Sequence, residues 1–262
     1  MLRAFSTAAT GMTAQQMIVD TLANNLANIN TVGFKRSQVD FQDLMYLKMK
    51  EAGREITAGV NAPSGLEIGS GVRPASTLKL FTQGEMQNTG RSLDIAIEGD
   101  GFLQVTTSGG EMRYTRDGSL RVDANGNLVT SGGNLLEPSI SIPSDARSVS
   151  IGSDGTVTVF SGNDNTPSVV GNIEVARFPN PSGLSSEGGN LLAETAASGS
   201  PDVVTPGTSG AGSIQQGFLE RSNVQMVTEL VELIQAQRAY ETNARAIRAG
   251  DEMLRSTSQM LT

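Results

Sequence analysis

The chain contains no cysteine, no histidine and no tryptophan among its 262 residues. Without cysteine it can form no disulfide. Without cysteine and histidine it lacks a thiolate nucleophile, an imidazole base and the usual zinc and haem ligands. Aromatic residues make up only 4% of the chain, so we expect a core built from Ala, Val, Leu and Ile. These absences predict a protein that is not an enzyme and that needs no cofactor or metal.

Positive charge is also scarce, with 19 Lys and Arg residues against 27 Asp and Glu residues and a formal net charge of -8. Because affinity for phosphate backbones comes from clustered Lys and Arg, we expect no nucleic-acid partner. No apolar run approaches the roughly 18 residues of a membrane span, so we expect no membrane insertion. The first residues have no apolar signal-peptide region, and we expect no cleavable signal.

Both ends of the chain show the alternating three- and four-residue spacing of a heptad pattern. The line at the start contains Leu2, Phe5, Ala9, Met12, Gln16, Val19, Ala23 and Leu26. The line at the end contains Met226, Leu230, Leu233, Gln237, Tyr240, Ala244, Ile247, Asp251, Leu254, Ser258 and Leu261. The pattern predicts two long helices paired as a coiled coil. Two amphipathic helices lying on a globular core are the alternative.

The middle of the chain, from Leu93 to Val175, carries strand and hairpin signals instead. Glycine-containing turn dipeptides recur there because glycine accepts a positive φ: Asp100-Gly101, Asp117-Gly118, Asn125-Gly126, Gly132-Gly133 and Asp154-Gly155. They predict an all-β meander or barrel-like domain. Residues 50–71 are weakly patterned, and residues 180–212 predict loop or extended linker.

The predicted fold class is therefore α+β, with the two terminal helices paired and the β domain inserted between them. We expect three parts: a helical coiled-coil domain at 1–33 and 220–262, a connector at 34–70 and 205–219, and a β-rich outer domain at 71–204.

Few residues combine into a credible catalytic or metal site. Glu98 and Asp100 lie close in sequence, and a secreted hydrolase using this carboxylate pair is a remote alternative. The sequence DANGNL resembles the start of a calcium loop, but its sixth position is Leu128 and its twelfth is Asn134. An EF-hand requires Gly and Glu there, so a turn is expected instead.

The terminal helices have more apolar surface than one pairing can cover. Leu22 and Ile29 lie beside the first line, and Val227, Val231 and Ile234 lie beside the second. Copies of the chain could bury this surface, and a heterologous contact that does not close gives a helical filament. The predicted assembly interface contains Phe5, Met12, Val19, Leu22, Leu26, Ile29, Leu230, Leu233, Ile234, Tyr240, Ile247 and Leu254.

A junction is predicted where the first helix must end. Asparagines are poor helix formers whose amides bond backbone or neighbouring chains, and glycine can stop a helix. We interpret this stretch as a junction crowded by other subunits. Its candidate residues are Asn24, Asn25, Asn28, Asn30, Gly33 and Phe34.

Three segments resemble a known family. They are ANNLANINTVGFKR at 23–36, SNVQMVTELVELIQAQRAYETNARAIRAGDEML at 222–254, and GSGVRPASTLKLFTQGEMQNTGRSLDIAIEGDGFLQV at 69–105. The chain is similar to the bacterial flagellar basal-body rod and hook proteins over nearly its whole length. Within that family it is most similar to the distal-rod members.

The resemblance implies a structural subunit that polymerises with itself into a helical hollow tube. Such a tube would transmit torque through the periplasm to the hook and enclose the export channel. The resemblance also implies type III export without a cleavable signal, and contacts with the proximal rod, the hook and the surrounding ring proteins. Another rod or hook subunit of the same family is the alternative.

Overall fold

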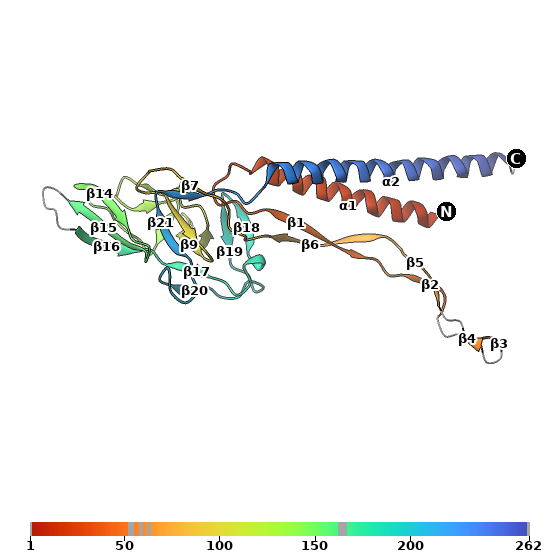
Figure 1. Cartoon of the computed structure of the whole chain (residues 1–262), viewed down its shortest axis with the longest axis horizontal. Coiled ribbons are helices and arrows are strands. Elements are labelled where there is room, and N and C mark those ends of the chain that lie inside the picture. The colour runs from red at the N-terminus through yellow and green to blue at the C-terminus, as the bar shows by residue number, and fades with distance from the viewer. Residues whose placement is uncertain (1, 52–54, 58–59, 62–63, 162–166, 261–262) are drawn as a thin grey trace. The chain divides into compact units, whose positions relative to one another are not determined.

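The computed structural model describes residues 2–51, 55–57, 60–61, 64–161 and 167–260 (Figure 1). The chain divides into two compact units. The first contains residues 1–26, 37–78 and 225–262, and the second contains residues 27–36 and 79–224.

Two long helices, which the heptad spacing predicts, dominate the first unit. The helix α1 is Leu2–Ala27 and α2 is Met226–Met260. Both lack proline, and α1 is rich in alanine, the best helix former. They lie side by side and antiparallel, because Asn25 contacts Glu229 near the start of α2 and Phe5 lies against Gly250 near its end (Figure 1).

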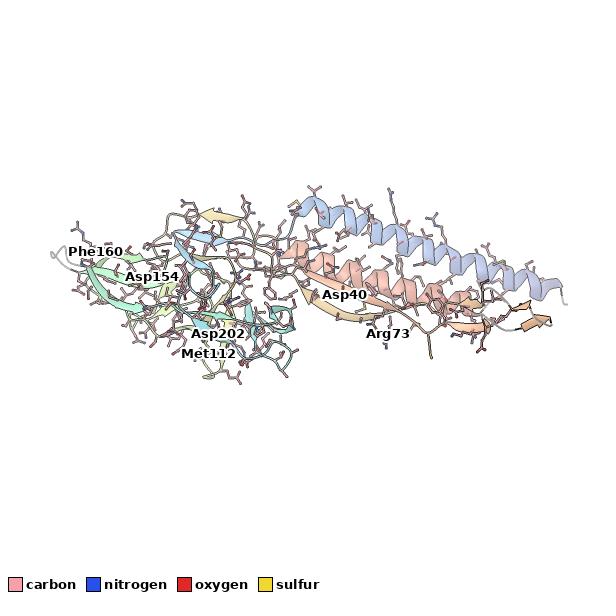
Figure 2. The ribbon with its side chains drawn as sticks, turned by 60° about the horizontal axis from the view of Figure 1, so that its bottom comes forward. Asp40, Arg73, Met112, Asp154, Phe160 and Asp202 are labelled. Atoms are coloured by element: carbon pink, nitrogen blue, oxygen red, sulfur yellow. The ribbon has the colours of Figure 1, made fainter. Side chains whose placement is uncertain are left out.

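The other described elements of the first unit are two-stranded pairings: β1–β6, β2–β5 and β3–β4. The side chains of Asp40 and Arg73 mark the first of these pairs (Figure 2). Strands therefore occupy much of the segment for which the sequence gives only a weak pattern. Their bounds are β1 Ser37–Asp43, β2 Leu47–Lys50, β3 Glu55–Thr57, β4 Val60–Asn61, β5 Leu66–Ile68 and β6 Val72–Lys79.

The second unit is almost entirely β. A nine-stranded sheet has the order β11-β12-β13-β9-β10-β19-β18, with β17 joining β9 and β20. Beside it are the sheet β14-β15-β16 and the pairs β21–β8 and β22–β7. The bounds are β7 Met86–Asn88, β8 Ile95–Glu98, β9 Phe102–Thr106, β10 Met112–Thr115, β11 Arg121–Val122, β12 Leu128–Val129, β13 Leu135–Glu137, β14 Ala146–Ile151, β15 Thr156–Ser161, β16 Pro167–Asn172, β17 Val175–Arg177, η1 Pro181–Gly183, β18 Ser185–Gly188, β19 Leu191–Ala193, β20 Asp202–Val204, β21 Ser213–Gln216 and β22 Phe218–Glu220.

The predicted turn dipeptides give hairpins at only some positions. Asn125-Gly126 joins β11 to β12, Gly132-Gly133 joins β12 to β13, and Asp154-Gly155 joins β14 to β15. After Asp100-Gly101, however, β9 does not pair with β8, because β8 pairs with the distant strand β21. Turn dipeptides therefore predict where the chain bends, but at Asp100-Gly101 they do not predict which strands pair.

Two clusters of buried residues form the core of the second unit. The larger is aliphatic, as the composition predicts, and includes Ile95, Leu103, Val159 and Val175. The smaller is aromatic, and its Tyr114 and Phe178 rings meet edge to face at 4.7 Å between centroids. The inserted β region therefore has its own hydrophobic core.

Two expectations for this region were wrong. The described strands form open sheets, and no barrel closes among them. The segment 180–212 is not only loop, since β18, β19 and β20 lie in it. These strands have only three or four residues each, and β18 consists of Ser, Glu and Gly, so their sequence carries little strand signal. Of the three, β19 pairs with a strand distant in sequence, Leu192 lying opposite Tyr114 of β10.

Candidate assembly site

The segment after α1 ends the helix through local hydrogen bonds. The helix stops at Ala27, before Gly33. Thr31 donates its backbone N–H to the carbonyl oxygen of Asn28 and its hydroxyl to the Asn28 side-chain oxygen, both at 3.1 Å. The asparagine thus provides the bonds that turn the chain, as short polar side chains do at helix ends.

Gly33 occupies a position that no other residue could fill without strain. Its φ is +68°, and its N–H donates to the carbonyl oxygen of Glu220 at 2.8 Å. A Cβ atom there would lie 2.7 Å from the carbonyl carbon of Arg116, which is backbone and cannot move aside. Both the conformation and the space therefore require glycine.

Three buried charged side chains meet beside Gly33. The Lys35 ammonium donates to Oε1 of Glu220 at 2.6 Å and to the carbonyl oxygen of Thr82 at 2.7 Å. The Arg116 guanidinium donates from both terminal nitrogens to the carbonyl oxygen of Gly99 at 2.8 and 2.9 Å. Its Nε lies 3.6 Å from Oε2 of Glu220. We call Lys35, Arg116 and Glu220 the charged triad.

The charged triad is held together by one carboxylate between two cations. Burial lowers the pKa of Lys35 from its usual value, although the neighbouring Glu220 carboxylate acts in the opposite direction. Burial also lowers the pKa of Arg116. Glu220 is only 1% exposed, so removing its carboxylate would leave Lys35 and Arg116 in the interior without the counter-charge that they share, and Arg116 would keep only the smaller effect of Asp100.

Further contacts hold residues 33–36 within the second unit. The side-chain oxygen of Asn223 accepts the backbone N–H of Arg36 at 2.8 Å, and its amide nitrogen donates to the carbonyl oxygen of Leu80 at 2.8 Å. The ammonium of Lys79 lies 5.7 Å above the ring of Phe34. Residues 33–36 are therefore bound to segments far away in the sequence.

The four predicted junction asparagines have different surroundings. Asn25 is fully buried in the first unit and is hydrogen-bonded there. Asn28 is half-buried, whereas Asn24 and Asn30 are exposed. Phe34 is half-buried. Contacts of these residues with other subunits stay a prediction.

The predicted interface residues differ in their exposure. Leu22 is buried. The half-buried members are Phe5, Met12, Val19, Leu26, Ile29, Leu233 and Ile247. The exposed members are Leu230, Ile234, Tyr240 and Leu254. Their role in assembly stays a prediction.

The fully buried positions of α2 are small or polar, and the half-buried Leu233 and Ile247 lie beside them. Glu229, Ala236 and Gly250 are buried along α2, and Ala14, Leu22 and Asn25 are buried along α1. None of these fully buried residues belongs to the predicted heptad lines. The heptad lines are recognised by their large apolar side chains. Ala, Gly and a hydrogen-bonded Glu do not contribute to such a pattern. A coiled-coil packing along the predicted lines therefore stays a prediction.

The opposite face of α2 exposes an apolar stripe over its first turns. At about 100° per residue, Val231 lies about 140–160° around the helix from Glu229 and Ala236. The stripe contains Val227, Leu230, Val231 and Ile234, which are 75%, 41%, 47% and 48% exposed. Met226, which is 52% exposed, borders the stripe about 60° around the helix from Glu229. Adjoining exposed apolar side chains of this kind mark interaction surfaces.

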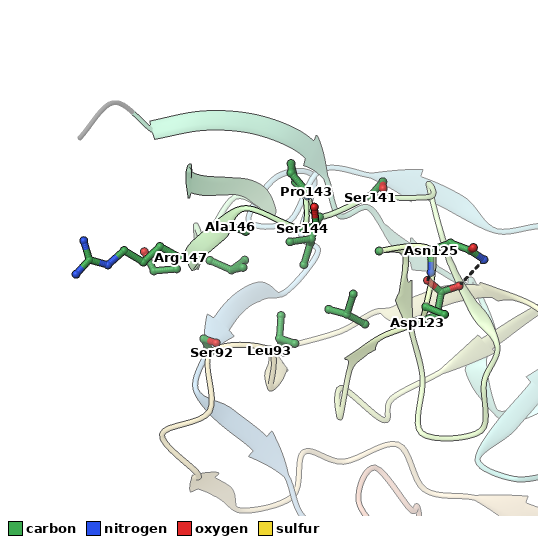
Figure 3. Close-up of a pocket in the computed structure, with 15 residues that line it drawn as sticks. Ser92, Leu93, Asp123, Asn125, Ser141, Pro143, Ser144, Ala146 and Arg147 are labelled. Atoms are coloured by element: carbon green, nitrogen blue, oxygen red, sulfur yellow. Dashed lines mark hydrogen bonds between the residues drawn. The ribbon is translucent and has the colours of Figure 1, made fainter. Parts of the chain in front are cut away.

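The carboxylates considered for catalysis have structural surroundings. Glu98 accepts a hydrogen bond from the Gln215 amide. Asp123 and Asn125 line an open pocket of about 550 Å³ (Figure 3). Its Asp123 carboxylate is engaged by the backbone N–H groups of Asn125 and Asn127, each at 2.8 Å. The expected turn at this loop is confirmed.

None of the helices within the described residues is both long enough and apolar enough to cross a lipid bilayer.

Three family models match the chain. Residues 5–35 match the flagella basal body rod protein, residues 96–159 match the flagellar hook protein FlgE/F/G D1 domain, and residues 215–260 match the flagellar basal body rod FlgEFG protein C-terminal segment. The first and last of these matches include most of α1 and all of α2.

Curated relatives extend this similarity along nearly the whole chain. The flagellar basal-body rod protein FlgG of Buchnera aphidicola subsp. Acyrthosiphon pisum is 47% identical over 251 residues, which is 96% of each chain. The FlgG of Borreliella burgdorferi is 47% identical over 256 residues, and that of Bacillus subtilis is 38% identical over 259 residues. Both alignments cover 97% of each chain.

Terminal helices with an exposed apolar stripe, a separate β unit and rod-protein relatives define a structural protein rather than an enzyme. The hydrolase alternative is therefore wrong. More specifically, the chain belongs to the flagellar basal-body rod and hook protein family and is a structural subunit of the rod.

Proposed function

We propose that this chain is a subunit of the distal rod. Copies of it assemble into a helical hollow tube that transmits torque through the periplasm to the hook and encloses the export channel. Similarity to rod proteins over 96–97% of the chain supports the family role. The observation that carries self-assembly is the apolar stripe on α2.

Burial of the apolar stripe provides the driving force for assembly. The contact between α1 and α2 uses the opposite face of α2, so the stripe stays available to a second copy. On the second copy, the apolar stripe would meet a surface other than the stripe itself, which makes the contact heterologous. Such a contact repeats without closing and produces a helical polymer. In the polymer, the terminal helices pack as coiled coils.

The parts of the chain have separate roles under this proposal. Residues 1–33 and 220–262 form the tube domain, residues 34–70 and 205–219 form the connector, and residues 71–204 form the outer domain. The chain is exported without a cleavable signal peptide. Its other partners are the proximal rod, the hook and the surrounding ring proteins.

A second candidate is another rod or hook subunit of the same family. The matched descriptions for residues 96–159 and 215–260 cover FlgE, FlgF and FlgG together, which is why this candidate stays open. The two candidates share the assembly mechanism and differ in position along the axis.

Sedimentation of the purified chain over a range of concentrations, followed by electron microscopy of the pellet, tests the proposal. We expect a critical concentration above which hollow tubes form. A chain that stays monomeric at every concentration would contradict self-assembly. Tubes that bind hook subunits at one end would favour the distal position over the second candidate.

A further inference from the structure

Asn25 connects three elements of the first unit through its side-chain amide. Its oxygen accepts the backbone N–H of Ser37 at 2.9 Å, and its nitrogen donates to the carbonyl oxygen of Ser37 at 2.9 Å. The same nitrogen donates to Oε2 of Glu229 at 3.1 Å. The end of α1, the start of β1 and the first turn of α2 therefore meet at one residue.

Both members of the Asn25–Glu229 pair are buried. Asn25 is 0% exposed and Glu229 is 1% exposed. The carboxylate lies in the first turn of α2, where the positive end of the helix dipole favours negative charge. A buried polar group is costly when it loses a hydrogen bond, and a buried charge is more so.

Two further contacts join α1 and α2. Gly11 faces Asn243, and Phe5 lies against Gly250. A shift by about one turn would move Phe5 toward Ala246 or Leu254, which are also apolar. A Cβ atom at Gly250 would lie 2.7 Å from the Phe5 ring, so the shift has a steric cost that this flexible side chain can partly relieve. The apolar contact itself is not directional, unlike a hydrogen bond.

We infer that the hydrogen bond between Asn25 and Glu229 fixes the axial register of α1 against α2. A shift by one turn in either direction breaks this bond inside the protein, and in one direction it places Leu233 opposite Asn25. A single buried polar residue is known to specify register in paired helices in this way. This inference concerns one chain and holds whether or not copies assemble.

The absence of cysteine makes the register directly measurable by disulfide formation. A Cβ atom at Gly11 would lie 3.5 Å from Cγ of Asn243, so cysteines at these positions are close to disulfide geometry. Gly11→Cys with Asn243→Cys therefore reports the observed register. Gly11→Cys with Ala239→Cys, or with Ala246→Cys, reports a shift by about one turn in each direction.

The test compares disulfide formation rates of these three full-length variants at high dilution under one oxidant. In the parent background, we expect the 11–243 disulfide to form at least about tenfold faster than either shifted one, as a preference of about 1.4 kcal/mol would give. Adding Asn25→Leu and Glu229→Leu replaces the polar pair with apolar residues that still favour helix pairing. The preference should then fall to within about threefold.

Two controls separate register from stability. Gln16→Leu with Glu241→Leu replaces an amide and a carboxylate by leucine at exposed positions of the two helices, and we expect the tenfold preference to persist. Glu229→Gln keeps an oxygen that accepts from Asn25 and should also preserve it. If the leucine pair lowers the helical circular dichroism signal, Glu229→Leu alone carries the same comparison, because it removes the acceptor and keeps both hydrogen bonds of Asn25 to Ser37.

An unchanged preference in the Asn25→Leu, Glu229→Leu background would overturn the inference. So would equal rates for all three cysteine pairs in the parent background, because the helices would then have no single register to fix.

Discussion

Val227→Asp tests the apolar stripe with little effect on the single chain. Val227 is 75% exposed, and it lies in the first turn of α2, where a carboxylate is favoured by the helix dipole. We therefore expect the unfolding temperature of the dilute chain to stay within a few degrees of the parent value. In a polymer that buries the stripe, the same carboxylate would be removed from water.

The size of the effect follows from burial. Covering the exposed three quarters of a valine contributes about 1 kcal/mol. Burying an unpaired carboxylate costs several kcal/mol more. A loss of at least about 3 kcal/mol raises the critical concentration of assembly more than about a hundredfold. Sedimentation against chain concentration measures this value directly.

Thr242→Asp is the control for this substitution. It introduces the same carboxylate at an exposed position of α2 about 12 Å along the helix beyond Ile234, and we expect a much smaller change. Equal critical concentrations for Val227→Asp and Thr242→Asp would refute the assignment of the stripe as an assembly surface. Parent-like assembly of Val227→Asp would do the same.

Three further predictions concern the second unit, and thermal or chemical unfolding measures each. Glu220→Ala should destabilise it by about 3–5 kcal/mol, because two buried cations lose their counter-charge; a loss below about 1 kcal/mol would contradict the charged triad. Gly33→Ala should cost at least about 2 kcal/mol from the positive φ and the backbone clash. Hydrogen bonds, chiefly from the Asn127 backbone, lower the pKa of Asp123, and those from Thr156 lower that of Asp154. Their stabilisation is present above about pH 4 and is lost as pH falls through the lowered pKa. The double variant Asp123→Asn, Asp154→Asn should therefore lose less stability than the parent during acidification, and equal losses would contradict this.

The helices could be predicted from sequence because their signal is local and repeated. The small and polar residues that are buried between them could not. Ala236 and Gly250 bury little apolar surface and so have no weight in a heptad pattern, yet small residues are what allow two helices to approach. Glu229 reads as a solvent-facing acid until its partner Asn25 is known.

The β region shows the same division between local and distant information. The dipeptide Asp154-Gly155 predicts the hairpin of β14 and β15 correctly, because a tight turn pairs the two strands that directly flank it. The pairing of β8 with β21 depends on segments more than a hundred residues apart, and no local pattern specifies it. Lys35 and Glu220 are a similar case, since neither sequence position indicates burial of a charge.

The central claim is that the apolar stripe is exposed in the single chain and buried in the assembled one. Because the chain has no cysteine, Val231→Cys provides a single thiol within the stripe, and Ser108→Cys provides one at an exposed position of the second unit. Maleimide labelling rates of both variants should be compared in the dilute chain and in the polymer. The account predicts that assembly slows labelling of Val231→Cys far more than that of Ser108→Cys. Equal labelling of Val231→Cys in both states would contradict it.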